Sequence, residues 1–213
     1  MNIRTVLFDL DGTLIDTNEL IIASFKYTFQ QYGKSLSREQ AIEFIGPPLA
    51  DTFRAVAETP EQAVEMKNMY RKHNMLNHDS YVVAFPHVKE TLEQLREKRI
   101  KLGIVTTKAR QTVDKGLGLT TIEPFFDTVI TLDDVTHAKP HPEPVFQAMK
   151  RLDAQAGSTL MVGDNSHDIE AGHHAGVHTA GVAWSLKGRN KLQEFQPTYM
   201  LDDMRDLLTI TGV

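Results

Sequence analysis

The sequence predicts an α/β protein, with a parallel β-sheet covered by helices on both faces and an all-helical insertion near its start. From about residue 81 onwards, short apolar runs typical of buried strands alternate with helical patterns, which is the arrangement of a parallel sheet. Residues 17–79, directly after the first apolar run, show helical patterns only. We therefore expect a core of residues 1–16 and 80–213 and a helical insertion of residues 17–79.

The first expected strand ends in a pair of acids. The apolar run Val6-Leu7-Phe8 is followed by Asp9, Leu10, Asp11 and Gly12. Strand alternation would place both carboxylates on one side, and the glycine indicates a turn at the edge where α/β sheets bind ligands. Two ionised carboxylates this close repel each other unless a cation or a proton separates them. The pair therefore suggests a hard divalent cation such as Mg²⁺, or alternatively an ordinary acidic turn.

Four helices are expected in the insertion. Thr17 stands where a residue caps the first helix, with Glu19 in its first turn. Ser37 and Gln40 have capping-box spacing for the second, and Pro60 suits the first position of the fourth. The expected ranges are Thr17 to Gly33, Ser37 to Ile45, Leu49 to Ala57 and Thr59 to about Asn77.

Strands and helices alternate through the rest of the chain. The expected strands are 101–106, 126–131, 159–163, 177–184 and 199–201. The expected helices are one opened by Phe85-Pro86-His87, one ending near Leu117, and those at 142–152, 169–175 and 204–210.

Composition excludes several classes of protein. The 213-residue chain has a net charge of −5, which disfavours a nucleic-acid-binding surface, and it contains no Cys for disulfides, thiol catalysis or Cys-ligated zinc. No apolar run approaches the length that spans a membrane. The first strand follows residues 1–4 directly, which leaves no room for a signal peptide. We expect a cytoplasmic protein without nucleic-acid or membrane partners, and the sequence predicts no oligomeric state.

Polar residues follow three further strands. Thr106-Thr107-Lys108 could form an anion site at a helix N-terminus, although capping by threonine is an alternative. Lys139 stands beside Pro140 in a stiff segment that can aim its ammonium group at a phosphoryl group and a carboxylate. Asp164 and Asp168 lie one helical turn apart and could be a helix cap with a first-turn acid. Combined with Asp9 and Asp11, they make an all-oxygen site suited to Mg²⁺.

These four groups, in this order and each after an apolar strand, resemble the motifs of the haloacid dehalogenase-like phosphohydrolase superfamily. The resemblance implies a Rossmann-like core with a helical, C1-type cap. It implies that Asp9 is a nucleophile that forms an aspartyl phosphate, and that Asp11 first protonates the leaving group and then activates water. Mg²⁺ would be held by Asp9, the Asp11 carbonyl and Asp164, with Asp168 supporting it from behind. Thr106, Thr107 and Lys139 would bind the phosphoryl group.

The insertion corresponds to the family's cap, with hinges near residues 15–17 and 79–85 and a role in excluding water and choosing the substrate. Asp11 with Gly12-Thr13 favours phosphoryl transfer over dehalogenation. Mutases of the family carry a cap histidine where this chain has Ile21, so mutase activity is not expected.

Within the superfamily, the wider match is to bacterial inorganic pyrophosphatases. The stretches that carry it are 17–22, 101–108, 129–135, 139–144, 161–165 and 179–184. It implies hydrolysis of pyrophosphate, which bacteria release when the serine-phosphorylated carrier protein HPr is dephosphorylated. The alternative is a phosphoglycolate phosphatase or another small-molecule phosphomonoesterase, although Thr107 and His87 stand where those relatives often have Asn and Gly.

A second phosphate would need its own donors. The candidates are Arg54, Arg71, Lys72, His73 and the Gly46 N–H from the cap, and Lys108 and Arg189 from the core. A solvated surface role is the alternative for each cation.

Two rival functions are weaker. Zinc binding at His173, His174 and His178 lacks a third ligand at zinc spacing, so surface or capping roles are favoured for these histidines. A non-enzymatic phospho-acceptor receiver domain also uses acids, Thr and Lys, but such domains are shorter and lack a helical insertion.

Overall fold

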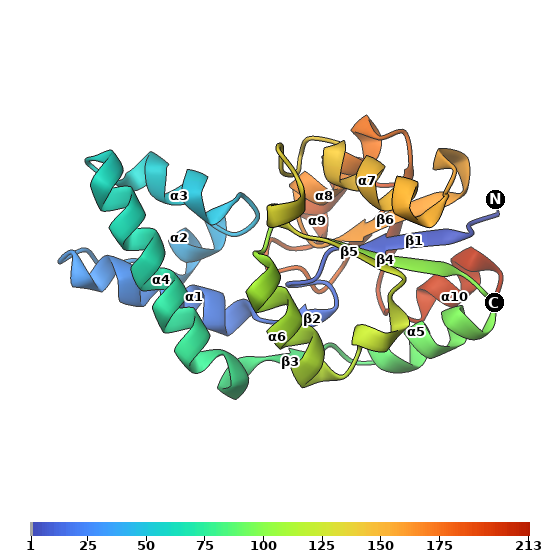
Figure 1. Cartoon of the computed structure of the whole chain (residues 1–213), viewed down its shortest axis with the longest axis horizontal. Coiled ribbons are helices and arrows are strands. Elements are labelled where there is room, and N and C mark those ends of the chain that lie inside the picture. The colour runs from blue at the N-terminus through green and yellow to red at the C-terminus, as the bar shows by residue number, and fades with distance from the viewer. Residues whose placement is uncertain (1) are drawn as a thin grey trace.

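A six-stranded, fully parallel sheet lies at the centre of the larger part of the computed structural model, which describes residues 2–213 (Figure 1). The strand order is β5-β4-β1-β6-β7-β8, so β1 lies in the middle. The strands are β1 (Thr5–Phe8), β4 (Lys101–Val105), β5 (Thr128–Ile130), β6 (Thr159–Gly163), β7 (His178–Val182) and β8 (Tyr199–Leu201). The predicted α/β class with a parallel sheet is confirmed.

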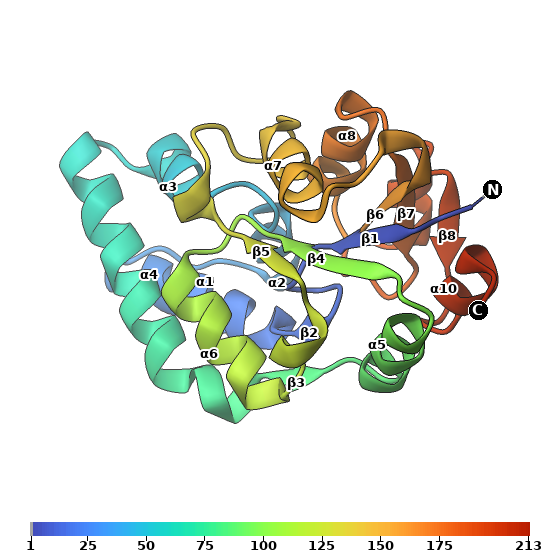
Figure 2. The ribbon, with the colours of Figure 1, turned by 45° about the vertical axis from the view of Figure 1, so that its right-hand side comes forward.

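Helices cover both faces of the sheet (Figures 1 and 2). Side chains alternate along β1, so Val6 and Phe8 pack with α5 (Val88–Glu97), α6 (Arg110–Thr120) and α10 (Asp206–Thr211). Leu7 points the other way and packs with α7 (Glu143–Leu152) and α8 (Ser166–His174). The side chains of Val6, Leu7 and Phe8 are fully buried, which fixes the position of the central strand and of Asp9 directly after it.

Residues 18–81 form a helical segment with its own apolar centre, at the left of Figure 1. Its helices are α1 (Asn18–Gln31), α2 (Arg38–Glu43), α3 (Leu49–Val56) and α4 (Pro60–Tyr81). Phe25 lies at the centre of an aromatic group with Phe44, Phe53 and Tyr70. The expected capping box of Ser37 and Gln40 is confirmed.

Helix α4 extends beyond its expected end near Asn77 and stops at Tyr81. No Gly or Pro interrupts it there, and His78 is fully buried, in contact with the position of Gly116 in α6. Packing against the core therefore continues the helix for another turn.

Two short strands join the helical segment to the core. β2 (Ile15–Asp16) pairs antiparallel with β3 (Val83–Ala84), and the Phe85 N–H donates to the Leu14 carbonyl at 3.0 Å. The sequence indicated two linkers here but no strands, because two residues are too few to show a periodicity. The chain thus leaves and re-enters the core at one place.

Other differences from expectation concern element ends. α8 begins at Ser166 rather than Ile169 because Asn165 caps it, and β7 ends at Val182, short of Trp184. The one-turn helix α9 (Arg189–Gln193) and the 3₁₀ turns η1 (Glu123–Phe125), η2 (Leu132–Asp134) and η3 (Ala156–Ser158) were not expected. Among residues 2–213, no helix has the length and apolar character needed to cross a bilayer.

Candidate active site

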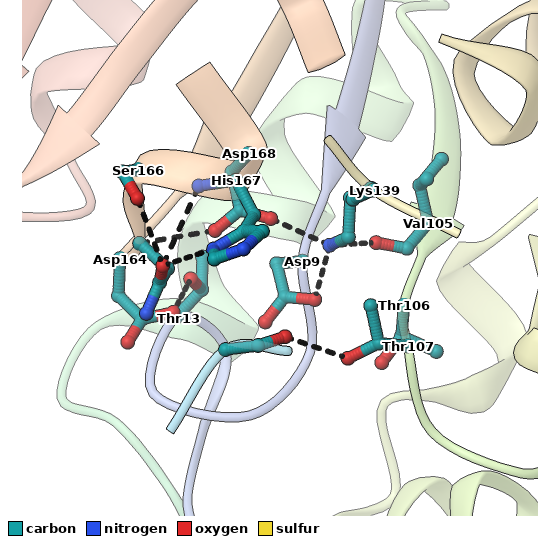
Figure 3. A network of polar contacts seen from close by, with 12 residues as sticks. Asp9, Thr13, Val105, Thr106, Thr107, Lys139, Asp164, Ser166, His167 and Asp168 are labelled. Carbon is teal, nitrogen blue, oxygen red and sulfur yellow. Dashed lines mark hydrogen bonds and ion pairs between the residues drawn. The ribbon is translucent and has the colours of Figure 1, made fainter. Parts of the chain in front are cut away.

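The carboxyl ends of the three central strands bring the predicted site residues together (Figure 3). Asp9 follows β1 directly, and its N–H donates to the Val162 carbonyl of β6 at 2.8 Å. Thr106 follows β4 and Asp164 follows β6. All three residues are buried although they are polar. Their position follows from the register of the parallel strands, as the sequence predicted.

Lys139 projects into this group from the loop before α7. Its ammonium donates to Asp9 Oδ1 at 2.7 Å, to Asp168 Oδ1 at 2.5 Å and to the Val105 carbonyl at 2.7 Å. Three donors therefore meet three acceptors in a side chain that is 2% exposed. Burial alone would lower the pKa of Lys139, but the charges of Asp168 and Asp9 outweigh it and raise the pKa, so the ammonium stays charged.

Asp9, Asp164 and Asp168 form a buried cluster in which one carboxylate oxygen from each residue lies within 4.8 Å of the other two. Burial raises the pKa of Asp9 to about 7, partly offset by Lys139, and burial with the charges of Asp9 and Asp168 raises the pKa of Asp164 well above its usual value. One lysine faces three acids in this cluster, so the protein alone leaves negative charge uncompensated. A divalent cation would supply what is missing, and the all-oxygen donor set suits a hard one.

The three acids differ in how their oxygens are used. Asp168 accepts from Lys139 at Oδ1 and from the Asn165 N–H at Oδ2, at 3.0 Å. Asp9 accepts Lys139 at Oδ1, and no hydrogen bond reaches its Oδ2 from residues 2–213. Asp164 Oδ1 accepts from Thr13 at 3.3 Å. Asp168 is therefore occupied on both sides, whereas Asp9 keeps an oxygen for another partner.

Two glycines make room for the cluster. Gly12 has φ +80°, and a Cβ there would lie 2.5 Å from Asp164 Oδ2. A Cβ on Gly163 would lie 2.3 Å from Asp168 Oδ2. The turn after β1 and the end of β6 thus require glycine for the acids to approach.

Asp11 has surroundings unlike those of Asp9. Strand alternation does not extend to it, because β1 ends at Phe8 and residues 10–15 form a turn. Asp11 Oδ1 accepts from the Lys108 ammonium and from the Thr17 hydroxyl, both at 2.6 Å. Thr17 stands at the N-cap position of α1, as expected, but its side chain makes no capping hydrogen bond and binds the acid instead.

The threonines after β4 do not cap the next helix. α6 begins at Arg110 with no side-chain cap, so the capping alternative for Thr106 is wrong. The Thr106 hydroxyl accepts from the Lys108 N–H at 3.2 Å, and the Thr107 hydroxyl donates to the Gly46 carbonyl of the helical segment at 3.4 Å. For the third group, the capping alternative holds in part, because Asp168 completes a capping box with Asn165.

A cavity of about 240 Å³ opens at this edge, between the sheet and the helical segment. The sheet contributes all the predicted site residues, and the helical segment contributes mainly apolar and aromatic side chains together with Arg71 and Asn74. From the helical segment the lining residues are Ile21, Phe25, Phe44, Ile45, Gly46, Pro47, Leu49, Ala50, Tyr70, Arg71, Asn74 and Met75. A space of this volume suits a small molecule rather than a polymer.

Most of the predicted donors for a second phosphate do not face the cavity. Arg71, Lys108 and Gly46 line it. The other candidates have partners or positions elsewhere: Arg54 pairs with Asp51 and Arg189 with Asp202, His73 stacks on Tyr27, and Lys72 is exposed outside the lining.

The sequence reasoning missed Asn165 and His167. Both line the cavity, and the Asn165 amide donates to the Ile45 carbonyl at 3.0 Å, linking the fourth group to the helical segment. Their place directly after Asp164, at the start of α8, was the available indication.

Comparison with known proteins places these features in one family. The family model described as haloacid dehalogenase-like hydrolase matches residues 6–182. A protein named Pyrophosphatase PpaX from Oceanobacillus iheyensis is 57% identical over 100% of this chain and 98% of its own, and its namesake from Anoxybacillus flavithermus is 56% identical over 100% and 99%. A solved haloacid dehalogenase-like family hydrolase from Streptococcus pneumoniae superposes with a TM-score of 0.86, at 27% identity over 98% of both chains.

Proposed function

The chain belongs to the haloacid dehalogenase-like hydrolase family, and from this premise we propose that it hydrolyses inorganic pyrophosphate to phosphate through an aspartyl-phosphate intermediate. The relatives named Pyrophosphatase PpaX, which match the whole chain, support the substrate. The chemistry rests on one observation above all: Asp9 is buried beside a cavity, held by Lys139 at one oxygen and reached by no hydrogen bond from residues 2–213 at the other. An acid so placed is a nucleophile.

In the first half-reaction, an Asp9 oxygen bonds to phosphorus and the bridging P–O bond breaks. Asp11, two residues along and facing the same cavity, gives a proton to the departing phosphate. In the second half-reaction, water attacks the phosphorus, its proton goes to Asp11, and the bond to Asp9 breaks. Lys108 and Thr17 hold the Asp11 carboxylate in place for both transfers.

A carboxylate attacks an anionic phosphoryl group only when their repulsion is cancelled. Lys139, which is charged and fixed by three acceptors, cancels part of it, and the Thr106 and Thr107 segment lies beside Asp9 to bind phosphoryl oxygens. The residues fit a Mg²⁺ ion held by Asp9, the Asp11 carbonyl and Asp164. Bound there, Mg²⁺ supplies the positive charge that the three-acid cluster lacks.

The helical segment is the substrate-selecting cap in this proposal, with residues 17–79 as cap and residues 1–16 and 80–213 as core. It supplies one wall of the cavity, and the paired strands β2 and β3 join it to the core. Arg71 is the cap cation that faces the cavity, so it is the proposed donor to the leaving phosphate.

Phosphate release from pyrophosphate, phosphoglycolate and p-nitrophenyl phosphate tests the proposal, each measured with Mg²⁺. We expect the highest kcat/KM for pyrophosphate and a loss of at least about 10³-fold for Asp9→Asn, because the nucleophile is removed. Asp114→Asn, at an exposed acid outside the cavity, is the control and should keep normal activity. A higher kcat/KM for phosphoglycolate contradicts the substrate, and normal activity of Asp9→Asn contradicts the mechanism.

A further inference from the structure

A second group of potential metal ligands lies on the surface of the loop that carries Lys139. His137, His141 and Glu143 each offer a ligand atom, and these three atoms lie within 4.8 Å of one another. Both histidines are exposed and Glu143 is partly buried. None of the three lines the catalytic cavity, so this group is separate from the acid cluster.

Glu143 is fixed by the backbone of the loop it closes. Its Oε1 accepts from the Thr136 N–H at 2.8 Å and its Oε2 from the His137 N–H at 2.9 Å. These two hydrogen bonds hold both carboxylate oxygens in one position. An oxygen ligand is thus already in position.

The two imidazoles are held beside that carboxylate. His137 Nδ1 lies 3.0 Å from Glu143 Oε2, and His141 Nδ1 accepts from the Glu143 N–H at 3.2 Å. The rings lie against each other, with centroids 4.6 Å apart. The two nitrogens and one oxygen therefore converge within one short loop, where the Thr136 N–H and the Gln147 amide also hold Glu143 Oε1.

We propose that His137, His141 and Glu143 bind a Zn²⁺ ion. Two imidazoles and one carboxylate are a donor set that Zn²⁺ uses when three protein ligands leave a fourth position to water. Mg²⁺, which demands oxygen ligands, is poorly matched to it, so the two sites select different ions. Each histidine exchanges one hydrogen bond to Glu143 for a bond to the metal.

The location gives the ion a structural consequence. Lys139 lies between the two histidines in sequence, and its ammonium points inward to Asp9, as Figure 3 shows. An ion that joins residues 137, 141 and 143 closes the outer side of the same loop. The Zn²⁺ site then restrains the segment that aims Lys139, without touching the cavity.

Calorimetric titration with ZnCl₂ in excess Mg²⁺ tests the site, because Mg²⁺ fills the acid cluster first. We expect one Zn²⁺ per chain, and an affinity at least about 10-fold lower in His137→Ala and in His141→Ala. His178→Ala, which removes a histidine that contacts the Gly157 carbonyl elsewhere on the surface, is the matched control and should bind as the unaltered protein does.

The readout is independent of the pyrophosphatase proposal, since it measures binding and not turnover. Thermal melts without Zn²⁺ confirm that each variant is folded, and His137→Ala alters a side chain that is 63% exposed. Absence of Zn²⁺ binding by the unaltered protein in excess Mg²⁺ overturns the proposal. Equal Zn²⁺ affinity in both histidine variants and the unaltered protein overturns it as well.

Discussion

The two walls of the catalytic cavity are built differently. On the sheet side, Asp9, Lys139 and Asp168 are almost fully buried, and each is held by hydrogen bonds at 3.0 Å or less. On the helical side, the wall is largely apolar, and its one cation, Arg71, is exposed without an ion pair or hydrogen bond among residues 2–213. The comparison suggests that one wall performs the chemistry and the other selects the substrate. Substitutions on the sheet side should therefore lower activity and stability, whereas substitutions on the helical side should change the choice of substrate.

The largest effect is expected at the buried lysine. Lys139→Met leaves Asp9 and Asp168 without their partner, so both activity and stability should fall, the activity by about 10²-fold or more and the stability by roughly 3–5 kcal/mol. Lys108→Met is the matched change, since Lys108 also pairs with an acid of the site but is 16% exposed. It should reduce activity with a smaller loss of stability. Chemical denaturation and steady-state kinetics measure both, and equal losses of stability would contradict the distinction.

The next effect separates backbone strain from crowding of the acids. Gly12→Ala and Gly33→Ala both place a Cβ at positive φ, which costs about 1 kcal/mol. At Gly12 the Cβ meets the Asp164 carboxylate, whereas at Gly33 it meets no atom of residues 2–213 within 4 Å. Gly12→Ala should therefore lower activity by at least about 10-fold, the size of effect expected when a metal ligand is displaced. It should also lower the affinity for Mg²⁺, so that a higher Mg²⁺ concentration is needed for half-maximal activity. Gly33→Ala should lower the melting temperature alone, and comparable activity losses in the two variants would count against the account.

On the helical wall, substrate choice should change while the chemistry survives. Arg71→Ala should raise KM for pyrophosphate about 10-fold, the loss of a charge-assisted contact, and leave kcat/KM for p-nitrophenyl phosphate nearly unchanged. Lys72→Ala is the control, because Lys72 is the next residue of α4 but lies outside the cavity lining. A rise in KM that is the same for both variants would show that net charge, not position, matters.

The smallest effect concerns stability in acid. In the core, burial opposes ionisation of Asp134, but hydrogen bonds from Thr131 and Arg151 outweigh it and lower its pKa. A lowered folded-state pKa stabilises the protein above the unfolded value, near pH 4, and the contribution is lost as the pH falls through the folded-state value. Asp134→Asn should therefore flatten the loss of stability below about pH 4.

Melting temperatures measured as a function of pH test this prediction, and the helical segment offers a matched comparison. Its Glu19 carboxylate pairs with Arg38, and the hydrogen bond lowers the pKa of Glu19, but both side chains are largely exposed. Glu19→Gln should change the fall in melting temperature below about pH 4 very little, because solvent screens exposed ion pairs. A larger change for Glu19→Gln than for Asp134→Asn would reverse the expected order.

The sequence predicted the sheet-side wall well because its physical causes are local. Asp9, Thr106 and Asp164 each follow an apolar run long enough to identify a buried strand, and parallel strands bring such positions to one edge. The contacts of Asp11 were not predictable in this way. Whether the Thr17 hydroxyl caps α1 or binds Asp11 depends on how the turn after β1 closes, which no short pattern encodes.

The sequence predicted the helices of the helical wall but not which of their side chains face the cavity. Seven candidate donors were equivalent in sequence, and the packing of α4 selects among those it carries. Met66, Tyr70 and Asn74 form its buried stripe, at spacings of four, and Arg71 lies at the edge of that stripe beside the cavity. The spacing of these buried residues could have favoured Arg71 over Lys72 as the residue that faces the cavity. The strands β2 and β3 and helix α9 were missed because they are too short to show a period.

The central claim, that Asp9 takes the phosphoryl group, can be tested by direct detection of the intermediate. Asp11→Asn removes the acid of the first half-reaction and the base of the second. Phosphate is a far better leaving group than water is a nucleophile, so the second half-reaction should slow more than the first and the intermediate should accumulate on pyrophosphate. Rapid acid quenching followed by peptide mass spectrometry should then find one phosphoryl group on Asp9, and none in the Asp9→Asn, Asp11→Asn double variant. A phosphoryl group on another residue, or steady turnover of pyrophosphate by Asp9→Asn, would contradict the account.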